Sequence, residues 1–298
     1  MKQISLVIVA GLLLAGCKSN NKYDASGVFE ATEVIVSSEG NGKILFLNVE
    51  EGQKLEANQQ VGQLDTVQLF LRKEQLLYSS KSLQNRKQDV STQTAALTEQ
   101  LATARKEQAR LQRLLANDAA TKKQMDDANA QVAVLEKQIA AQTSVLEKTN
   151  NAVVADNSSL EVQMAQIDDQ LAKSRIVSPI AGTVIAKYTR RGEVTVAGKP
   201  IFKIADLENM ILRIYITSEQ LTQLKLGQEI SIFADFGKER KQYKGTICWI
   251  SSQAEFTPKS IQVKDDRDNL VYAVKVAVKN DGYLKIGMYA EVKWKIEN

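Results

Sequence analysis

Histidine is absent from the 298 residues, and glycine and proline are missing from a long central stretch. Without an imidazole, Ser-His-Asp and Cys-His nucleophilic catalysis and zinc sites with histidine ligands are excluded, whereas carboxylate and lysine chemistry are not. The chain has 15 glycines and 3 prolines, but none of them lies between Gly62 and Pro179. Because these two residue types interrupt helices and strands, the gap predicts roughly a hundred residues of uninterrupted regular structure.

Charge and aromatic residues give no sign of a polyanionic partner. The 39 basic residues exceed the 35 acidic residues by only four, and no long run of lysine or arginine is present. Between Gly62 and Pro179 the aromatic side chains are Phe70 and Tyr78. Nucleic-acid binding needs a basic surface and, for single strands, stacking aromatics. The sequence therefore predicts no nucleic-acid partner.

The amino terminus has the pattern of a bacterial lipoprotein signal. Lys2 precedes an apolar stretch over residues 4–15, and this stretch runs into the residues Leu14-Ala15-Gly16-Cys17. Small residues before a cysteine predict cleavage of a signal peptide, residues 1–16, followed by a lipidated Cys17 and a polar tether over residues 17–26. The acyl chains would hold the protein on a membrane surface. An ordinary secretory signal with a chance cysteine is the less favoured alternative.

The second cysteine, Cys248, lies in a strand-like run over residues 245–250. If Cys17 is lipidated, no intramolecular disulfide can form. No histidine or basic motif near Cys248 would lower the pKa of its thiol, so a buried, inert thiol is favoured over a reactive one.

Two series of residues, all of them apolar, recur at strict seven-residue spacing inside the region without glycine or proline. The series are Leu69, Leu76, Leu83, Val90, Leu97, Ala104 and Leu111, and Met125, Val132, Ile139, Leu146, Val153, Leu160 and Ile167. Heptads predict a coiled coil, and the gap between the series predicts a helical hairpin over residues 66–174 with its tip near 117–122 and Thr121 as a helix cap. Two helices of about 50 residues would make a hairpin about 75 Å long. Judged from the heptads alone, the favoured interpretation is that this coiled coil serves as a spacer.

The segments on either side of the hairpin resemble each other. Residues 40–64 align without gaps on residues 180–204, at an offset of 140 positions. The alignment places Gly42 on Gly182, Gly52 on Gly192, Val61 on Ile201 and Leu64 on Ile204. Each half is predicted to form a strand, a glycine turn and a second strand. Unrelated β-hairpins that share turn glycines are the alternative.

The pair of segments resembles the two halves of a biotinyl/lipoyl domain. A lipoyl domain split by a helical hairpin is similar to the periplasmic adaptor, or membrane fusion protein, family of bacterial efflux and secretion systems. Carrier lipoyl domains hold their cofactor on a lysine at the turn between the halves, but here the hairpin occupies that place, entered after Asp65 and left at Arg175. The chain contains no Asp-Lys-Ala or Met-Lys-Met. No covalent cofactor is therefore expected, and a biotinyl or lipoyl carrier is the weakest alternative.

The resemblance extends to the hairpin tip. Adaptors that dock on a TolC-like outer-membrane channel carry an arginine, a leucine four residues later and a serine seven residues after that. This sequence matches at Arg110 and Leu114 and has Thr121 in place of the serine. Threonine keeps the hydroxyl group and the capping ability. The resemblance thus implies that Arg110, Leu114 and Thr121 contact an outer-membrane channel.

The carboxy-terminal third resembles the adaptor β-barrel domain. Strands are predicted at 210–216, 229–233, 244–250 and 270–278, with a short helix over 218–227, which together suggest a six-stranded antiparallel barrel. The segment 254–267 looks like the barrel loop of adaptors that accompany ABC-type exporters. Asp265, Asp266 and Asp268 suggest a cation site, but their spacing lacks the glycine and distal glutamate of a calcium loop, so a solvated acidic turn is favoured.

The resemblance implies an elongated, mixed α and β multidomain fold, in which the hairpin is inserted into a split lipoyl (barrel-sandwich hybrid) domain that an antiparallel β-barrel follows. The predicted segments are a membrane-proximal or barrel strand at 27–36, lipoyl halves at 37–65 and 175–206, the hairpin at 66–174, the barrel at 207–280 and closing barrel or membrane-proximal strands at 281–298.

The function that the resemblance implies is non-enzymatic. It is that of a lipid-anchored adaptor in the periplasm of a Gram-negative bacterium, with no catalytic or metal-binding residue. The adaptor would assemble as a hexamer and link an inner-membrane transporter, with an ABC type favoured over an RND type, to a TolC-like channel for export of small molecules or peptides. A structural envelope lipoprotein with a coiled-coil spacer is the alternative.

Overall fold

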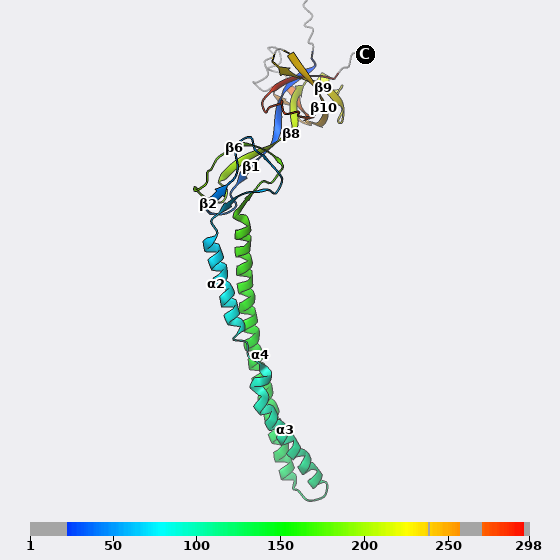
Figure 1. The fold of residues 1–298 in the computed structure, drawn as a ribbon. Helices are drawn as coiled ribbons and strands as arrows, with labels where there is room; N and C mark the ends of the chain where they lie inside the picture. Colours follow the sequence, from blue (N-terminus) through cyan, green and yellow to red (C-terminus); the bar gives the residue numbers. More distant parts are fainter. Residues whose placement is uncertain (1–22, 238, 257–269, 295–298) are drawn as a thin grey trace, which may run out of the picture.

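The computed structural model describes residues 23–237, 239–256 and 270–294. The chain is elongated, with a β-barrel at one end, a smaller β-domain in the middle and a helical hairpin that projects from the other end (Figure 1). This arrangement confirms the fold class predicted from the sequence. Among the described residues, no helix combines the length and the apolar character needed to cross a bilayer.

The barrel is a closed ring of six antiparallel strands. They are β1 (Ala25–Ser37), β8 (Pro200–Ile216), β9 (Glu229–Phe236), β10 (Glu239–Ile250), β12 (Leu270–Lys279) and β13 (Tyr289–Lys293). Their order is β12-β10-β9-β13-β1-β8, and β8 pairs again with β12 to close the ring. The two-residue strand β11 (Glu255–Phe256) adds to β12. Alternating apolar residues of these strands, such as Phe29, Leu212 and Ile232, fill the interior and are fully buried.

Two strands of the barrel continue into the middle domain. The first half of β1 pairs with β13 and with the end of β8, whereas residues 32–37 pair with residues 200–206 at the start of β8. The pairing shifts register between Glu30 and Thr32, where one domain passes into the other. The boundary that we expected between residues 206 and 207 therefore falls inside a continuous strand. The two domains share a β-ribbon and are not joined by a flexible linker.

Two smaller expectations for the barrel differ from the structure. The helix expected over 218–227 is the single turn α5 (Ser218–Leu221), and the chain turns toward β9 at Gly227, which has a φ of 82°. In the described part of the closing segment, residues 281–294, one strand, β13, follows a turn at Gly287. β13 pairs with both β1 and β9, so it is part of the barrel wall.

The middle domain is built from the predicted repeat. Its strands are β2 (Gly42–Leu47), β3 (Lys54–Leu55), β4 (Gln60–Leu64), β5 (Arg175–Val177), β6 (Gly182–Lys187) and β7 (Val194–Thr195), together with the start of β8. β6 and β7 repeat β2 and β3 at the predicted offset of 140 residues, and the start of β8 repeats β4. Each half completes the other, because β3 pairs with β6 and β7 pairs with β2.

Equivalent hydrogen bonds cross between the two halves of this domain. Gly52 N donates to Val184 O, and Gly192 N donates to Ile44 O, both at 2.8 Å. Both glycines have φ near +90°, a conformation that side chains disfavour and that explains why glycine recurs at this turn. The core between the halves is formed by residues that match across the repeat, such as Ile44 with Val184 and Leu64 with Ile204.

The hairpin consists of α2 (Val67–Gln84), α3 (Val90–Leu115) and α4 (Lys122–Lys173). Its second arm is one helix of 52 residues, as expected. The first arm is not a single helix, because residues 85–89 interrupt it. The prediction of uninterrupted regular structure was wrong at this point. The interruption needs neither glycine nor proline. Asp89 ends it by capping α3, since its carboxylate accepts hydrogen bonds from Ser91 N at 3.0 Å and the Thr92 hydroxyl at 2.7 Å.

A side chain of α4 satisfies the backbone at this interruption. Asn150 accepts a hydrogen bond from Gln88 N at 2.9 Å and donates one to Gln88 O at 2.8 Å. Asn150 is only 8% exposed. The five interrupting residues keep the seven-residue spacing from Leu83 to Val90, so both predicted ladders face the seam between the two arms. Every residue of the first ladder is half-buried, and Val132, Leu146 and Ile167 of the second are buried.

Candidate functional site

The hairpin tip is a tight, hydrogen-bonded turn between α3 and α4. Asp118 adopts a left-handed conformation with a φ of 55°, which reverses the chain direction. Ala119 N donates to Leu114 O at 2.9 Å, and the Asn117 side chain donates to Arg113 O at 2.8 Å. These bonds pair the last carbonyl groups of α3, so the turn is structured without a partner.

Arg110 lies on the exposed surface of α3 and is held by a neighbour. Its guanidinium group donates two hydrogen bonds to the carboxylate of Glu107, at 2.8 and 2.6 Å. This hydrogen bonding and the charge of Glu107 raise the pKa of Arg110, while the bonds from Arg110 lower the pKa of Glu107. Arg110 thus carries a fixed positive charge near the tip. A partner that binds Arg110 with its own acidic group would compete with Glu107.

Leu114 and Thr121 contribute to the tip in a different way. Leu114 is half-buried in the seam, and its carbonyl accepts the turn hydrogen bond. Thr121 begins α4 with a capping box: its hydroxyl accepts from Gln124 N at 3.3 Å, and Gln124 Oε1 accepts from Thr121 N at 2.8 Å. The structure therefore shows Thr121 as the helix cap that the sequence predicts. Of the three residues expected to touch a channel, Arg110 is the charged one, and its side chain is exposed.

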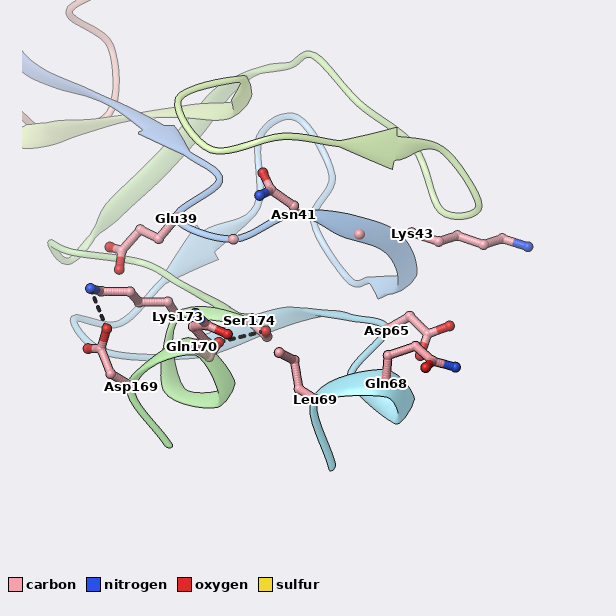
Figure 2. A pocket seen from close by; sticks show the side chains of 12 residues that line it. Glu39, Asn41, Lys43, Asp65, Gln68, Leu69, Asp169, Gln170, Lys173 and Ser174 are labelled. Carbon is pink, nitrogen blue, oxygen red and sulfur yellow. Dashed lines mark hydrogen bonds and ion pairs between the residues drawn. The ribbon is translucent and has the colours of Figure 1, made fainter. Parts of the chain in front are cut away.

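A second candidate site is a cleft of about 670 Å³ at the root of the hairpin. It lies where the strand entering β2, the first turn of α2 and the last turn of α4 meet (Figure 2). Its charged side chains are those of Glu39, Lys43, Asp65, Asp169 and Lys173. In Figure 2 the amino group of Lys173 lies beside Asp169 and near Glu39, whereas Lys43 extends away.

In the cleft at the root of the hairpin, Lys173 forms an ion pair and Asp65 caps a helix. Lys173 Nζ lies 2.7 Å from Asp169 Oδ2, and this hydrogen bond, the charge of Asp169 and the charge of Glu39 raise the pKa of Lys173. A protonated lysine is not a nucleophile. The Asp65 carboxylate accepts from Val67 N at 3.0 Å and so takes up one of the free amides of α2. The junction where a carrier domain would place its lysine is thus occupied by helix ends.

Other residues singled out in the sequence lie elsewhere. Cys248 is exposed at a β-bulge between β10 and β12, so the expectation of a buried thiol was wrong. Tyr243, Gly245 and Ile247 are buried and the residues between them are exposed, so Cys248 continues the outward-facing positions of β10. Cys17 and the acidic residues Asp265, Asp266 and Asp268 fall outside the described residues. Within the described ranges, no group of histidine, cysteine, aspartate or glutamate residues is arranged to hold a metal ion.

Comparison with known families identifies the middle domain and its inserted hairpin. Residues 32–207 match a family model described as RND MFP, barrel-sandwich hybrid domain. The chain is a membrane fusion protein. The match covers more than half of the chain, including both halves of the repeat and the whole hairpin. Membrane fusion proteins of this family are periplasmic adaptors without enzymatic activity.

Curated relatives match a part of this membrane fusion protein. A UPF0194 membrane protein of Yersinia enterocolitica is 32% identical over 125 residues, which is 42% of this chain and 38% of the relative. A UPF0194 membrane protein of Salmonella gallinarum is 30% identical over 128 residues, which is 43% of this chain and 38% of the relative. The aligned regions span less than half the length of these relatives.

Solved structures show the same fold over most of the chain. MacA from Actinobacillus actinomycetemcomitans matches with a TM-score of 0.56 and 21% identity, covering 90% of this chain and 76% of MacA. The membrane fusion protein Spr0693 from Streptococcus pneumoniae R6 matches with a TM-score of 0.53 and 17% identity, covering 92% and 98% of the two chains. At such identities the likeness concerns the fold alone.

Sequence reasoning missed the interruption at residues 85–89 and the pairing of Gln88 with Asn150. Two signals were present. Asp89 is followed by Ser91 and Thr92, a helix-start pattern. Asn150 lies among the apolar residues of the second arm, four positions after Leu146.

Proposed function

We propose that this protein is a lipid-anchored periplasmic adaptor that joins an inner-membrane transporter to a TolC-like outer-membrane channel, for export of small molecules or peptides. The observation that carries the proposal is the insertion of a long hairpin between the two halves of a barrel-sandwich hybrid domain. The hairpin projects directly away from the β-barrel (Figure 1). A molecule with two different β-domains at one end and a structured helical tip at the other is suited to connect two membranes.

The barrel end would face the inner membrane and its transporter. β1 enters the barrel at Ala25, so the proposed anchor at Cys17 would be eight residues away from it. An ABC-type exporter is the first candidate partner, because the segment 254–267 resembles the barrel loop of ABC-associated adaptors. An RND transporter is the second candidate, and the name of the matching family model favours it.

The tip would face the channel. Arg110 offers a charge and Leu114 an apolar edge four residues later on the same side of α3, a pair that fits a groove between two helices of a partner. Thr121 would contribute by holding the turn in shape through its cap. By analogy with the family, six copies would surround the export path.

Reversing the charge of Arg110 tests the tip assignment. In a strain that lacks every paralogous adaptor, Arg110→Asp should leave expression and membrane anchoring unchanged and should increase sensitivity to exported toxic compounds. The matched control is Arg113→Asp, an exposed arginine of the same helix that does not belong to the Arg110, Leu114 and Thr121 set, and this variant should keep resistance at the unmutated level. Equal resistance in both variants would refute the tip assignment. Resistance that never depends on the adaptor would favour the spacer function instead.

The anchor is tested separately. Cys17→Ala should move the protein from the membrane fraction to the soluble periplasm, because no acyl chain can then be attached. Retention of this variant on membranes in a strain without the transporter and the channel would contradict lipidation.

A further inference from the structure

The outward face of α2 carries a stripe of large apolar side chains. Its members, between 49% and 67% exposed, are Val67, Phe70, Leu71, Leu77 and Tyr78. Spacings of three, four and seven residues place them on one side of the helix, away from the seam that Leu69, Leu76 and Leu83 form with α4. On α3, by contrast, no large apolar side chain is exposed. Such a cluster on one helix marks an interaction surface.

Charge separates the two arms over the same half of the hairpin. Residues 67–87 contain five basic and one acidic residue, a net charge of +4, whereas residues 150–173 of α4 contain four acidic and one basic residue, a net charge of −3. Lys73 and Asp168 pair across the hairpin at 2.6 Å. In the outer half the two arms do not carry opposite charges, since α3 has a net charge of +2 and residues 122–149 have a net charge of zero.

α4 carries exposed apolar residues at the height of the α2 stripe. Two contacts across the seam show which residues of α2 and α4 lie at the same level along the hairpin. Lys73 forms an ion pair with Asp168, and the Ser80 hydroxyl donates a hydrogen bond to Asn157 Oδ1 at 2.6 Å. Val162, which is 60% exposed, lies between these two levels. Val154, which is 50% exposed, lies one turn beyond the second. α2 and α4 form opposite edges of the hairpin (Figure 1).

We propose that the α2 stripe of one copy docks on residues 150–173 of α4 in a second copy of this chain, beside it and at the same height. Opposite net charges attract these two surfaces, and each offers apolar side chains to the contact. Because the two surfaces differ, the contact is head-to-tail and can continue around a ring. α3 has neither the apolar stripe nor an oppositely charged neighbour, so the proposed contact lies in the half of the hairpin next to the β-domains. The inference deepens the self-association in the proposed function, on which it rests, by naming its surfaces.

Site-specific photo-crosslinking in cells that make the full-length protein tests this contact. A benzoylphenylalanine residue in place of Leu77 should give a covalent dimer, and the crosslinked peptide should map to residues 150–173. The matched control is Thr98, exposed on α3 three heptads further along, where the same probe should give no dimer above background. Dimers of equal yield from both positions, no dimer from Leu77, or capture of a different protein by Leu77 would each overturn the proposal.

Charge exchange tests the pairing of the surfaces. Lys81→Glu alone and Asp156→Lys alone should each lower the dimer yield from Leu77 about two- to fivefold, as the loss of exposed ion pairs implies. The double variant should restore the yield, and additive losses would count against this pairing. The readout needs neither transporter nor channel. A dimer through α2 and α4 in a protein without export activity would leave this inference standing and remove the proposed function.

Discussion

Replacing Asn150 with alanine removes both side-chain hydrogen bonds that satisfy the interruption in the first arm. The bonds to Gln88 N and Gln88 O are 2.9 and 2.8 Å long. Each contributes a net of about 0.5–1.5 kcal/mol, so their loss costs about 1–3 kcal/mol. Alanine favours a helix interior over asparagine by roughly 0.5 kcal/mol, which offsets part of that cost. Gln88 is exposed, so water can partly replace the lost bonds, and we expect a net loss of about 1–2 kcal/mol.

The neighbouring Asn151 provides the matched control, because it is exposed on the same helix. Asn151→Ala should change helix propensity alone and stabilise slightly. The free energy of unfolding is measured in urea by circular dichroism at 222 nm, a signal that the hairpin dominates. Hydrogen exchange adds a local readout, since the Gln88 amide should exchange faster in Asn150→Ala. Equal unfolding free energies in the two variants, with unchanged exchange at Gln88, would refute the role assigned to Asn150.

Two further predictions concern the tip and the barrel. Thr121→Ala should destabilise the hairpin by about 1 kcal/mol through loss of the cap, whereas Thr121→Ser should not, and equal urea midpoints for both variants would contradict the cap. Asp281 accepts hydrogen bonds from Lys241 and from Tyr283 N, which hold the pKa of Asp281 below its ordinary value of 3.8. Its stabilising contribution is therefore present above that value and lost as the pH falls through the lowered pKa. Asp281→Asn should weaken the barrel at neutral pH and lower its acid sensitivity, as thermal melts at pH 3 and 7 would show, and a variant with unchanged acid sensitivity would exclude this role.

The repeat was predictable because the same pattern of turn glycines and apolar residues occurs in two short segments of the sequence. Gly52 and Gly192 occupy the same positive-φ turn in the two halves, and apolar residues at matching positions form one shared core. Neither half can bury that core alone, so a repeat on both sides of the hairpin implies a single domain. The heptad ladders were predictable for a similar reason. A strict seven-residue period leaves one seam for the two arms to share.

The remaining features depend on contacts between distant residues. Gln88 and Asn150 are 62 positions apart, and nothing in either local sequence shows that an amide side chain will satisfy the backbone there. The shared strands β1 and β8 crossed an expected boundary because their pairing partners change along their length, from barrel strands to strands of the middle domain. The alternation of residues 245–250 does not by itself say which set faces the barrel interior, and the structure buries Ile247 and exposes Cys248. The bulge then inverts the pattern, so that Trp249 is exposed as well.

The two halves of the hairpin differ in where their polar and apolar residues lie. Near the β-domains, leucines such as Leu69 and Leu76 lie in the seam, and α2 carries a second set of large apolar side chains that face outward. In the outer half, Val132 and Leu135 are buried in the seam and the outer face of α3 is polar. A hairpin that served only as a spacer would gain nothing from an outward apolar face on α2. An outward apolar face on α2 gains burial once a neighbour covers it, whereas the polar outer face of α3 needs no such cover and remains available to another partner.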